Sequence, residues 1–142
     1  MISSFSGNYK FLSNFSPSLV VLDGELYPTV ENAYQAAKTE SPLLRMYYFQ
    51  LTSPNIAKAA GRKIELREGW EEMKEAVMFD LLAQKFQITE LRKKLLATGT
   101  QSLVEGNWWH DNFWGSCRCP EHKGRMGKNR LGFLLMKIRN AL

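Results

Sequence analysis

The chain has 142 residues and a mass of 16.3 kDa; 44% of its residues are hydrophobic and 23% are charged. This length suits one domain, and the composition excludes an intrinsically disordered protein. We expect neither a secretory signal nor a membrane span, because no apolar run approaches the ~20 residues that a span requires. Two cysteines are too few for a disulfide scaffold, so we expect a cytoplasmic protein.

The net charge is +5 and the sequence pI is near 9.3, which favours anionic partners such as phosphates, nucleotides or nucleic acid. The basic residues are spread along the chain, so we interpret most of them as solvated helix faces. Aromatic residues make up 12% of the chain, more than a small core obviously needs. We therefore expect some of them to form a wall for flat, sugar-linked rings.

The first half of the chain begins with residues 1–30, which read as short strands and turns with a hairpin around Asp23-Gly24. Thr29 is expected to cap a helix that Pro42 interrupts or ends. The pair Ser53-Pro54 predicts the start of a short helix over 54–60. We expect Gly61 to end that helix in a left-handed conformation.

The second half contains three further helix patterns. Apolar spacing predicts an amphipathic helix over about 69–87, a helix that Thr89 caps and Gly99 ends, and a final helix with a stripe from Leu131 to Leu142. The stretch 102–128 is the least regular, and it holds three of the four Trp, both His and both Cys. A long irregular segment that is this aromatic is typical of a functional loop.

The first helix carries a candidate acid–base pair. Glu31, Tyr34 or Gln35, and Lys38 have the spacing of one helix face. Glu31 could act as a general base, and Lys38 could act as a nucleophile if burial lowers its pKa. The alternative is that Glu31 only interacts with the positive end of the helix while the lysine is solvated.

The segment LVEGNWWHDNFWGS places Glu105 and Asp111 among tryptophans. Carboxyl groups in apolar surroundings are candidates for acid–base catalysis, and Trp faces stack on bases and sugars. The alternative is that the Trp rings fill the core while the acids cap backbone amides. We favour the core for Trp108 and Trp109, and function for Asp111 and Trp114.

Two further patterns follow in the same stretch. Cys117, Cys119 and His122, with His110 upstream, are enough ligands for a zinc ion. The C-x-C spacing is not the usual one, so we expect two ordinary thiols and no metal, and a zinc-stabilised nucleic-acid binder is a third interpretation. Before the last helix, Lys128 and Asn129 lie in a Gly-rich stretch that could hold phosphate, unless Asn129 only caps the helix.

The motifs, in their order along the chain, resemble the YbiA-like NADAR family, which is associated with NAD and ADP-ribose. The matching segments run from Phe11 to Arg139: FLSNFSP, TVENAYQAAK, IAKAAGRKIELREGW, the M-x₆-KF of Met78 to Phe86, LLATG, LVEGNWWHDNFWG and GKNRLGFLLMKIR. The resemblance implies a compact, mainly α (α+β) fold, one domain over residues 1–142, with a small N-terminal β-hairpin. Between Gly115 and Gly127 the chain is longer and richer in cysteine than the family pattern.

The resemblance also implies an N-glycosidase that works without a cofactor on the bond between a ribose carbon and an amino nitrogen. One branch of the family acts on ribosylated intermediates of riboflavin biosynthesis, and another removes ADP-ribose from guanine amino groups in nucleic acid. The substrate would therefore be nucleotide-like or ADP-ribosylated, with no membrane partner. The pocket residues of the family correspond here to Asn14, Glu31, Lys38, Trp70, Lys85, Glu105, Asp111, Trp114 and Asn129.

We accordingly expect Glu31 to act as acid and base, Lys38 to polarise or attack the sugar, and Asp111 to assist. Glu105 is a further candidate for the catalytic set. Trp70 and Trp114 would stack on the base or the sugar, and Arg62, Lys128 and Asn129 would hold phosphate. The alternative function is a non-catalytic module that binds ADP-ribose or a nucleotide.

Overall fold

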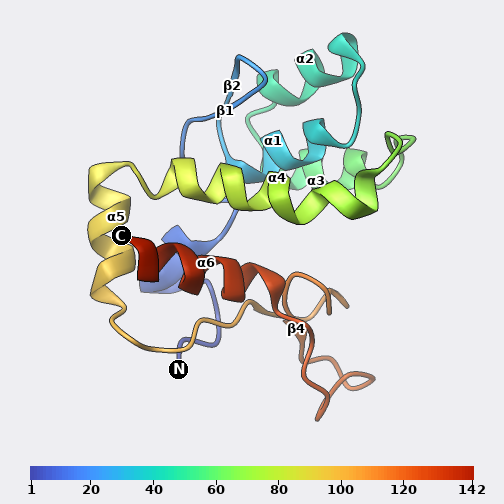
Figure 1. The fold of residues 1–142 in the computed structure, drawn as a ribbon. Helices are drawn as coiled ribbons and strands as arrows, with labels where there is room; N and C mark the ends of the chain where they lie inside the picture. Colours follow the sequence, from blue (N-terminus) through green and yellow to red (C-terminus); the bar gives the residue numbers. More distant parts are fainter. The chain divides into compact units, whose positions relative to one another are not determined.

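The computed structural model describes residues 1–142, whose backbone forms seven helices and two small two-stranded sheets (Figure 1). The chain divides into two compact units. The central unit is Asn14–Gln87, and the terminal unit combines Met1–Ser13 with Ile88–Leu142. No helix in the structure has the length and apolar character needed to cross a membrane. The mostly helical α+β class expected from the sequence is confirmed.

The central unit begins with the predicted hairpin. Strand β1 (Val20–Leu22) pairs antiparallel with β2 (Glu25–Tyr27), with Val20 opposite Tyr27. Asp23 and Gly24 both have positive φ angles, 47° and 85°. Two successive left-handed residues give the turn whose twist matches a two-residue hairpin, so the Asp-Gly signal is confirmed.

Helix α1 (Val30–Ala37) is the centre of this unit. All eight of its residues are buried, and it contacts α2 (Pro42–Gln50), α3 (Pro54–Gly61) and α4 (Trp70–Lys85). Thr29 caps it as expected, because its hydroxyl accepts a hydrogen bond from the Asn32 amide. Figure 1 shows α4 running beside α1. A helix buried on every side holds its polar residues in place.

Three expectations for the first half are wrong. Helix α1 already ends at Ala37, and Pro42 begins α2, because proline suits a first helical position and the Ser41 hydroxyl caps the Leu44 amide. Residues Gly7–Leu12 form a 3-10 helix, η1, where strands and turns are expected. Helix α3 includes Gly61, which is not left-handed.

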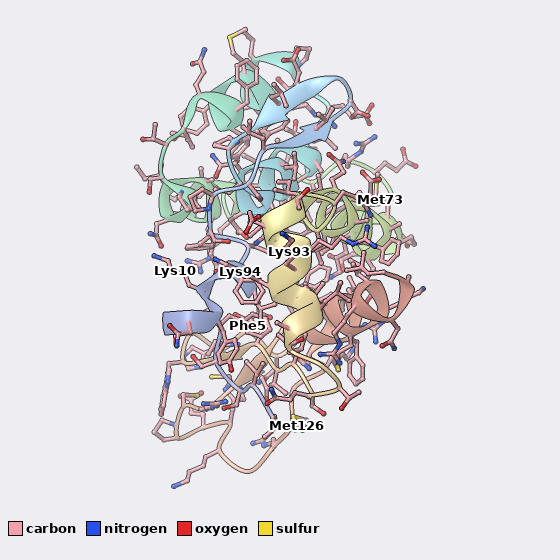
Figure 2. All side chains as sticks on the ribbon, turned by 90° about the vertical axis from the view of Figure 1, so that its left-hand side faces the viewer. Phe5, Lys10, Met73, Lys93, Lys94 and Met126 are labelled. Carbon is pink, nitrogen blue, oxygen red and sulfur yellow. The ribbon has the colours of Figure 1, made fainter.

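The terminal unit contains η1, α5 (Thr89–Ala97), α6 (Arg130–Ala141) and the parallel strands β3 (Gly106–Asn107) and β4 (Ser116–Cys117). Ile2 bridges Leu103 in parallel, which joins the first residues to the second half of the chain. The buried residues of α6 include Leu131, Leu134, Leu135 and Ile138, which belong to the predicted stripe, whereas Leu142 at its end is only half-buried. The basic residues Lys10 of η1 and Lys93 and Lys94 of α5 are labelled in Figure 2.

The other sequence predictions for this half have mixed outcomes. The helix over about 69–87 is confirmed as α4, and Gly99, with a φ of 63°, follows the end of α5 as expected. Thr89 is the first residue of α5, and Ile88 takes the N-cap position with no side-chain cap, so the predicted Thr89 cap is wrong. Residues 102–128 contain only the two-residue strands β3 and β4, which confirms the irregular stretch.

Candidate functional site

Glu31 lies in the first turn of α1 and is only 6% exposed. Its Oε1 accepts a hydrogen bond of 2.7 Å from Gln35 Nε2, one turn along the helix. Its backbone amide donates to the Asn14 carbonyl oxygen. A carboxyl group held this way has a fixed orientation, which both a general acid and a general base need.

Lys38 follows α1 as its C-cap residue and is half-buried. Its Nζ donates to the Gly61 carbonyl oxygen at 3.4 Å and lies 5.6 Å from the centre of the Tyr34 ring. Burial lowers the pKa of this amine most, and the positive charge of Arg62 lowers it further, whereas the Glu31 charge acts in the opposite direction. The Glu31 charge therefore acts on the Lys38 amine, which is half-buried and so only partly exposed to solvent.

The other candidates in the central unit surround α1. Trp70, at the start of α4, is 4% exposed, and its ring centre lies 5.3 Å from that of Tyr34. Asn14 is buried, and its Nδ2 donates to Met78 Sδ. Arg62 is the exposed C-cap residue of α3, and its positive charge helps to lower the pKa of the Lys38 amine. Exposure and charge leave the Arg62 guanidinium available to an anion.

Lys85 is a completely buried lysine at the end of α4. Its Nζ donates a hydrogen bond of 2.9 Å to Ser16 Oγ. Burial lowers its pKa to about 7, because the charged ammonium loses its hydration. Sequence reasoning did not identify Ser16, whose only signal was its place in the FLSNFSP motif.

In the terminal unit, Asn129 holds Glu105 by its backbone. Asn129 Oδ1 accepts from the Glu105 amide and Asn129 Nδ2 donates to the Leu103 carbonyl oxygen, at 3.0 and 2.9 Å. The residue occupies the N-cap position of α6 in a left-handed conformation, but its side chain makes no cap hydrogen bond. The alternative that the Asn129 side chain only caps the helix is therefore wrong, and a phosphate-binding role stays a prediction.

The Glu105 carboxylate lies in a narrow space. Its Oε2 accepts from Nδ2 of Asn107, which is fully buried, and a Cβ atom at Gly115 would overlap this carboxylate oxygen. Asn107 also donates to the Asp111 carbonyl oxygen at 2.8 Å. Asn107 thus connects both predicted acids, although nothing in the sequence distinguished it.

Asp111 and Trp114 belong to one tight turn. Asp111 Oδ1 accepts from the amides of Phe113 and Trp114, at 3.1 and 2.9 Å, and the Trp114 ring packs edge-on against Phe113. Asp111 therefore caps backbone amides, which was the alternative to a catalytic role in the sequence analysis. Both side chains are half-buried, and their catalytic and stacking roles stay predictions.

The expectation that Trp108 and Trp109 fill the core is wrong, because they are 65% and 50% exposed. Trp108 lines a groove of about 690 Å³ together with Arg118, Lys123, Arg125 and Met126. Met126, labelled in Figure 2, is itself strongly exposed. Lys128 is exposed as well, and its Nζ lies over the Phe113 ring. Flat rings beside cations suit an anionic aromatic ligand.

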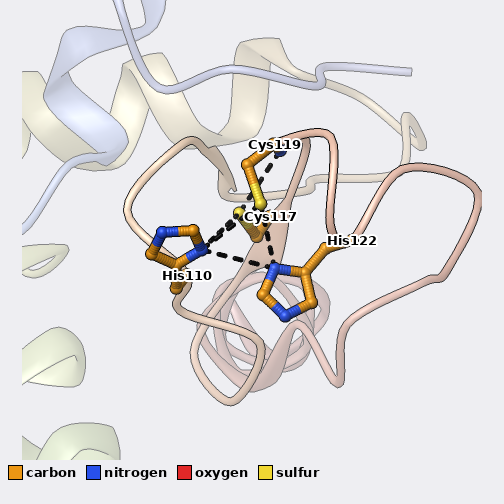
Figure 3. Close-up of side chains that lie close together, drawn as sticks. All are labelled: His110, Cys117, Cys119 and His122. Carbon is orange, nitrogen blue, oxygen red and sulfur yellow. Dashed lines mark hydrogen bonds between the residues drawn. The ribbon is translucent and has the colours of Figure 1, made fainter.

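His110, Cys117, Cys119 and His122 lie together in the terminal unit, with one ligand atom from each within 4.8 Å of every other (Figure 3). Both cysteines are buried and carry free thiols. The chain spacing alone argued against such an arrangement. The turn around Asp111 brings His110 to the two cysteines, and rules based on sequence spacing do not take such a turn into account.

The structure thus places the predicted residues in two sets. Asn14, Glu31, Lys38, Arg62, Trp70 and Lys85 are in the central unit, and Glu105, Asp111, Trp114, Lys128 and Asn129 are in the terminal unit. The assistance of Asp111 to Glu31 stays a prediction.

The fold and the α1 geometry define a mostly helical α+β protein with a buried carboxyl group and a half-buried amine on one helix. Residues 3–142 match the NADAR domain, and the chain belongs to the NADAR family. The resemblance seen in the sequence motifs is therefore confirmed.

Three relatives illustrate the similarity. The N-glycosidase YbiA of Escherichia coli is 39% identical over 98% of this chain and 85% of its own length, and the NMR structure of E. coli YbiA superposes with a TM-score of 0.81, covering 99% of this chain and 82% of that one. The N-glycosidase Npun_R5314 of Nostoc punctiforme is 34% identical over 94% of this chain and 86% of its own length. The riboflavin biosynthesis protein VVA0006 of Vibrio vulnificus is 32% identical over 95% of this chain, which spans 36% of that longer protein.

Proposed function

We propose that this protein is an N-glycosidase that hydrolyses the bond between a ribose carbon and an amino nitrogen. The observation that carries the proposal is the pair on α1: a buried, oriented Glu31 and a half-buried Lys38 with a lowered pKa. A module that only bound an anion would gain nothing from a buried carboxylate at its site. Two of the relatives are named N-glycosidases, which supports the same reaction class.

The chemistry follows from the two groups. Breaking the bond builds positive charge on the ribose, which the Glu31 carboxylate would stabilise, and the departing amine needs a proton, which its acid form would supply. In one route Glu31 also activates the water that attacks the sugar. In the other, neutral Lys38 attacks the ribose C1 and expels the amine, which leaves with the proton from Glu31. The C1–ring oxygen bond then breaks, the lysine nitrogen loses a proton and the ring oxygen gains one, and a Schiff base forms. Water hydrolyses the Schiff base to release the sugar and regenerate Lys38.

For the substrate, we propose either a guanine amino group that carries ADP-ribose or a ribosylated intermediate of riboflavin biosynthesis. Both place a phosphorylated ribose beside a flat ring. The net charge of +5 and the exposed Arg62 favour phosphate, and Trp70 would contact the ring. The name of the Vibrio relative supports the riboflavin branch.

The test offers both substrate classes to the purified protein side by side and identifies the products by mass spectrometry. We expect a free sugar phosphate or ADP-ribose, and we expect Glu31→Gln and Lys38→Ala to reduce turnover by about 100-fold or more while thermal stability changes little. Lys63→Ala removes an exposed lysine just after α3 and serves as the matched control. Full activity in both variants would contradict the assignment, and tight binding without products would favour the binding module.

Borohydride separates the two routes. If Lys38 forms a Schiff base, borohydride reduces it to a stable amine, and the peptide that contains Lys38 gains the mass of the sugar less one oxygen atom. The Lys38→Ala variant must then show no adduct. Turnover without any trapped adduct would assign the reaction to direct hydrolysis.

A further inference from the structure

The chain contains only two cysteines and two histidines, and the fold gathers all four in one place. Cys117 and Cys119 are 2% and 5% exposed, whereas His110 is exposed and His122 half-buried. Figure 3 shows the two rings and the two sulfur atoms turned toward a common centre. All four residues belong to the terminal unit, and none is part of the α1 pair.

Four distances among these atoms are close to those of a tetrahedral zinc site. Zinc bonds of about 2.3 Å to sulfur and 2.0–2.1 Å to nitrogen require ligand atoms about 3.3–3.8 Å apart. Cys119 Sγ lies 3.3 Å from His110 Nδ1 and 3.0 Å from His122 Nδ1. The two Nδ1 atoms are 3.4 Å apart, and Cys117 Sγ is 4.0 Å from His110 Nδ1. One small ion would fit at the centre with little movement of the side chains.

The backbone around the cluster supports the same interpretation. His110 has a φ of 69°, a conformation that costs energy for a residue with a Cβ atom, and it directs the ring to the sulfurs. The Cys119 amide donates to Cys117 Sγ, and the Cys117 amide donates to Asn112 Oδ1. Such outer hydrogen bonds orient metal ligands. Two residues separate Cys119 from His122, which is a usual ligand spacing, and the His122 amide donates to the Cys119 carbonyl oxygen to close that turn.

We propose that His110, Cys117, Cys119 and His122 form a structural Zn²⁺ site. Two thiolates and two imidazoles in a tetrahedral arrangement are a ligand set typical of zinc. Four protein ligands leave no open position for a reacting water, so the ion ties the loop together and takes no part in glycosidase chemistry. The segment that it closes includes Asp111 and Trp114, and three of the four ligands lie where the chain departs from the family pattern.

The first experiment measures the metal content of the purified full-length protein by mass spectrometry. We expect about one zinc ion per chain. After removal of the zinc under reducing conditions, added Co²⁺ should give the visible absorption bands of a tetrahedral thiolate complex. A protein that holds no zinc, and that takes up neither Zn²⁺ nor Co²⁺ after reduction, would overturn the proposal, as would a disulfide between the two cysteines in the freshly purified protein.

Substitutions among the four residues test which of them bind the zinc ion. Cys119→Ser and His122→Gln should each reduce the zinc content from about one ion per chain to less than about a tenth of that. Glu121→Gln, at an exposed residue next to His122, is the matched control and should keep its zinc. If a ligand variant does not fold, the cobalt spectrum of the unchanged protein still decides. Full zinc content in both ligand variants, with both folded, would place the metal elsewhere and refute this site. Zinc content and the cobalt spectrum do not depend on turnover, so they test the zinc site separately from the proposed function.

Discussion

At the residue scale, Gly61 shows how the last turn of a helix can require glycine. A Cβ atom at this position would overlap Oε1 of Gln35, whose Nε2 orients Glu31. The usual rule for an exposed helix favours alanine over glycine by about 1 kcal/mol. Here the neighbouring buried amide reverses the sign of that rule. The glycine therefore supports the carboxyl group indirectly, by leaving room for its partner.

We predict that Gly61→Ala lowers the free energy of unfolding by about 1–3 kcal/mol, because the new methyl group must displace a buried side chain. Turnover should fall as well, since Gln35 can no longer hold Glu31 in the same orientation. Urea unfolding curves measure the first effect and steady-state kinetics the second. Ala59→Ser, at an exposed position of the same helix, should change the unfolding free energy by less than about 0.5 kcal/mol.

A double variant tests the cause. Gln35→Ala makes space for the methyl group, so Gly61→Ala should cost less in that background than in the native chain, with a coupling of about 0.5–3 kcal/mol. Strictly additive effects would mean that the two residues do not meet, and the interpretation of Gly61 would be wrong.

At the scale of elements, helix α4 ends in a lysine that is buried at a cost. The pKa of Lys85 falls to about 7 in the folded protein, below its ordinary value of 10.5. Below pH 7 the amine is charged in both the folded and the unfolded state, so the full cost of burying a charge is present. Between pH 7 and about pH 10 the folded state has lost the proton while the unfolded state keeps it. The free energy of unfolding must therefore rise with pH in this window.

We predict a slope of at most about 1.4 kcal/mol per pH unit from Lys85 in this window. Lys85→Met keeps the length and the apolar stem but removes the amine, so this contribution should disappear. Urea unfolding between pH 7 and about pH 9 gives the slope for each protein. The titratable groups that both proteins share contribute equally to the two slopes and cancel in their difference. Equal slopes in the two proteins would contradict the assigned pKa.

Local signals explain which elements were predictable. The Asp23-Gly24 turn, the Thr29 cap and the glycine after α5 depend on neighbours in the sequence, and all three are confirmed. Pro42 fits both the end of one helix and the start of the next, and the sequence interpretation chose wrongly. The missing left-handed turn at Gly61 has a different cause, because contact with a side chain on another helix sets the need for glycine there.

The site was predictable to a similar degree. Glu31 and Lys38 follow from helical spacing, which is a local property. The exposure of Trp108 and Trp109 and the gathering of two histidines with two cysteines depend on the path of residues 102–128, where no period guides a prediction. Asn129 was placed correctly at the start of α6, but its side chain bonds to a segment more than twenty residues away in the sequence. Contacts of that kind are invisible to spacing rules.

At the scale of the whole molecule, the terminal unit is built from two distant parts of the chain. The Ile2 amide donates to the Ser102 carbonyl oxygen, and the Val104 amide donates to the Ile2 carbonyl oxygen. The first residues thus depend on the second half of the chain for their hydrogen bonds. The central unit is continuous in sequence, but it is also small. Below about 70–80 residues, a single core rarely supplies more than a few kcal/mol.

We therefore predict one cooperative unfolding transition, as the expected single domain over residues 1–142 requires. Tryptophan fluorescence tests this separately in each unit. Trp70→Phe leaves reporters only in the terminal unit, and replacing Trp108, Trp109 and Trp114 by Phe leaves Trp70 alone in the central unit. In each variant the urea midpoint from fluorescence should coincide with its own midpoint from far-ultraviolet circular dichroism, because coincident probes are the mark of a two-state transition. Separate midpoints would show that the units unfold independently and would replace the single-domain prediction by two.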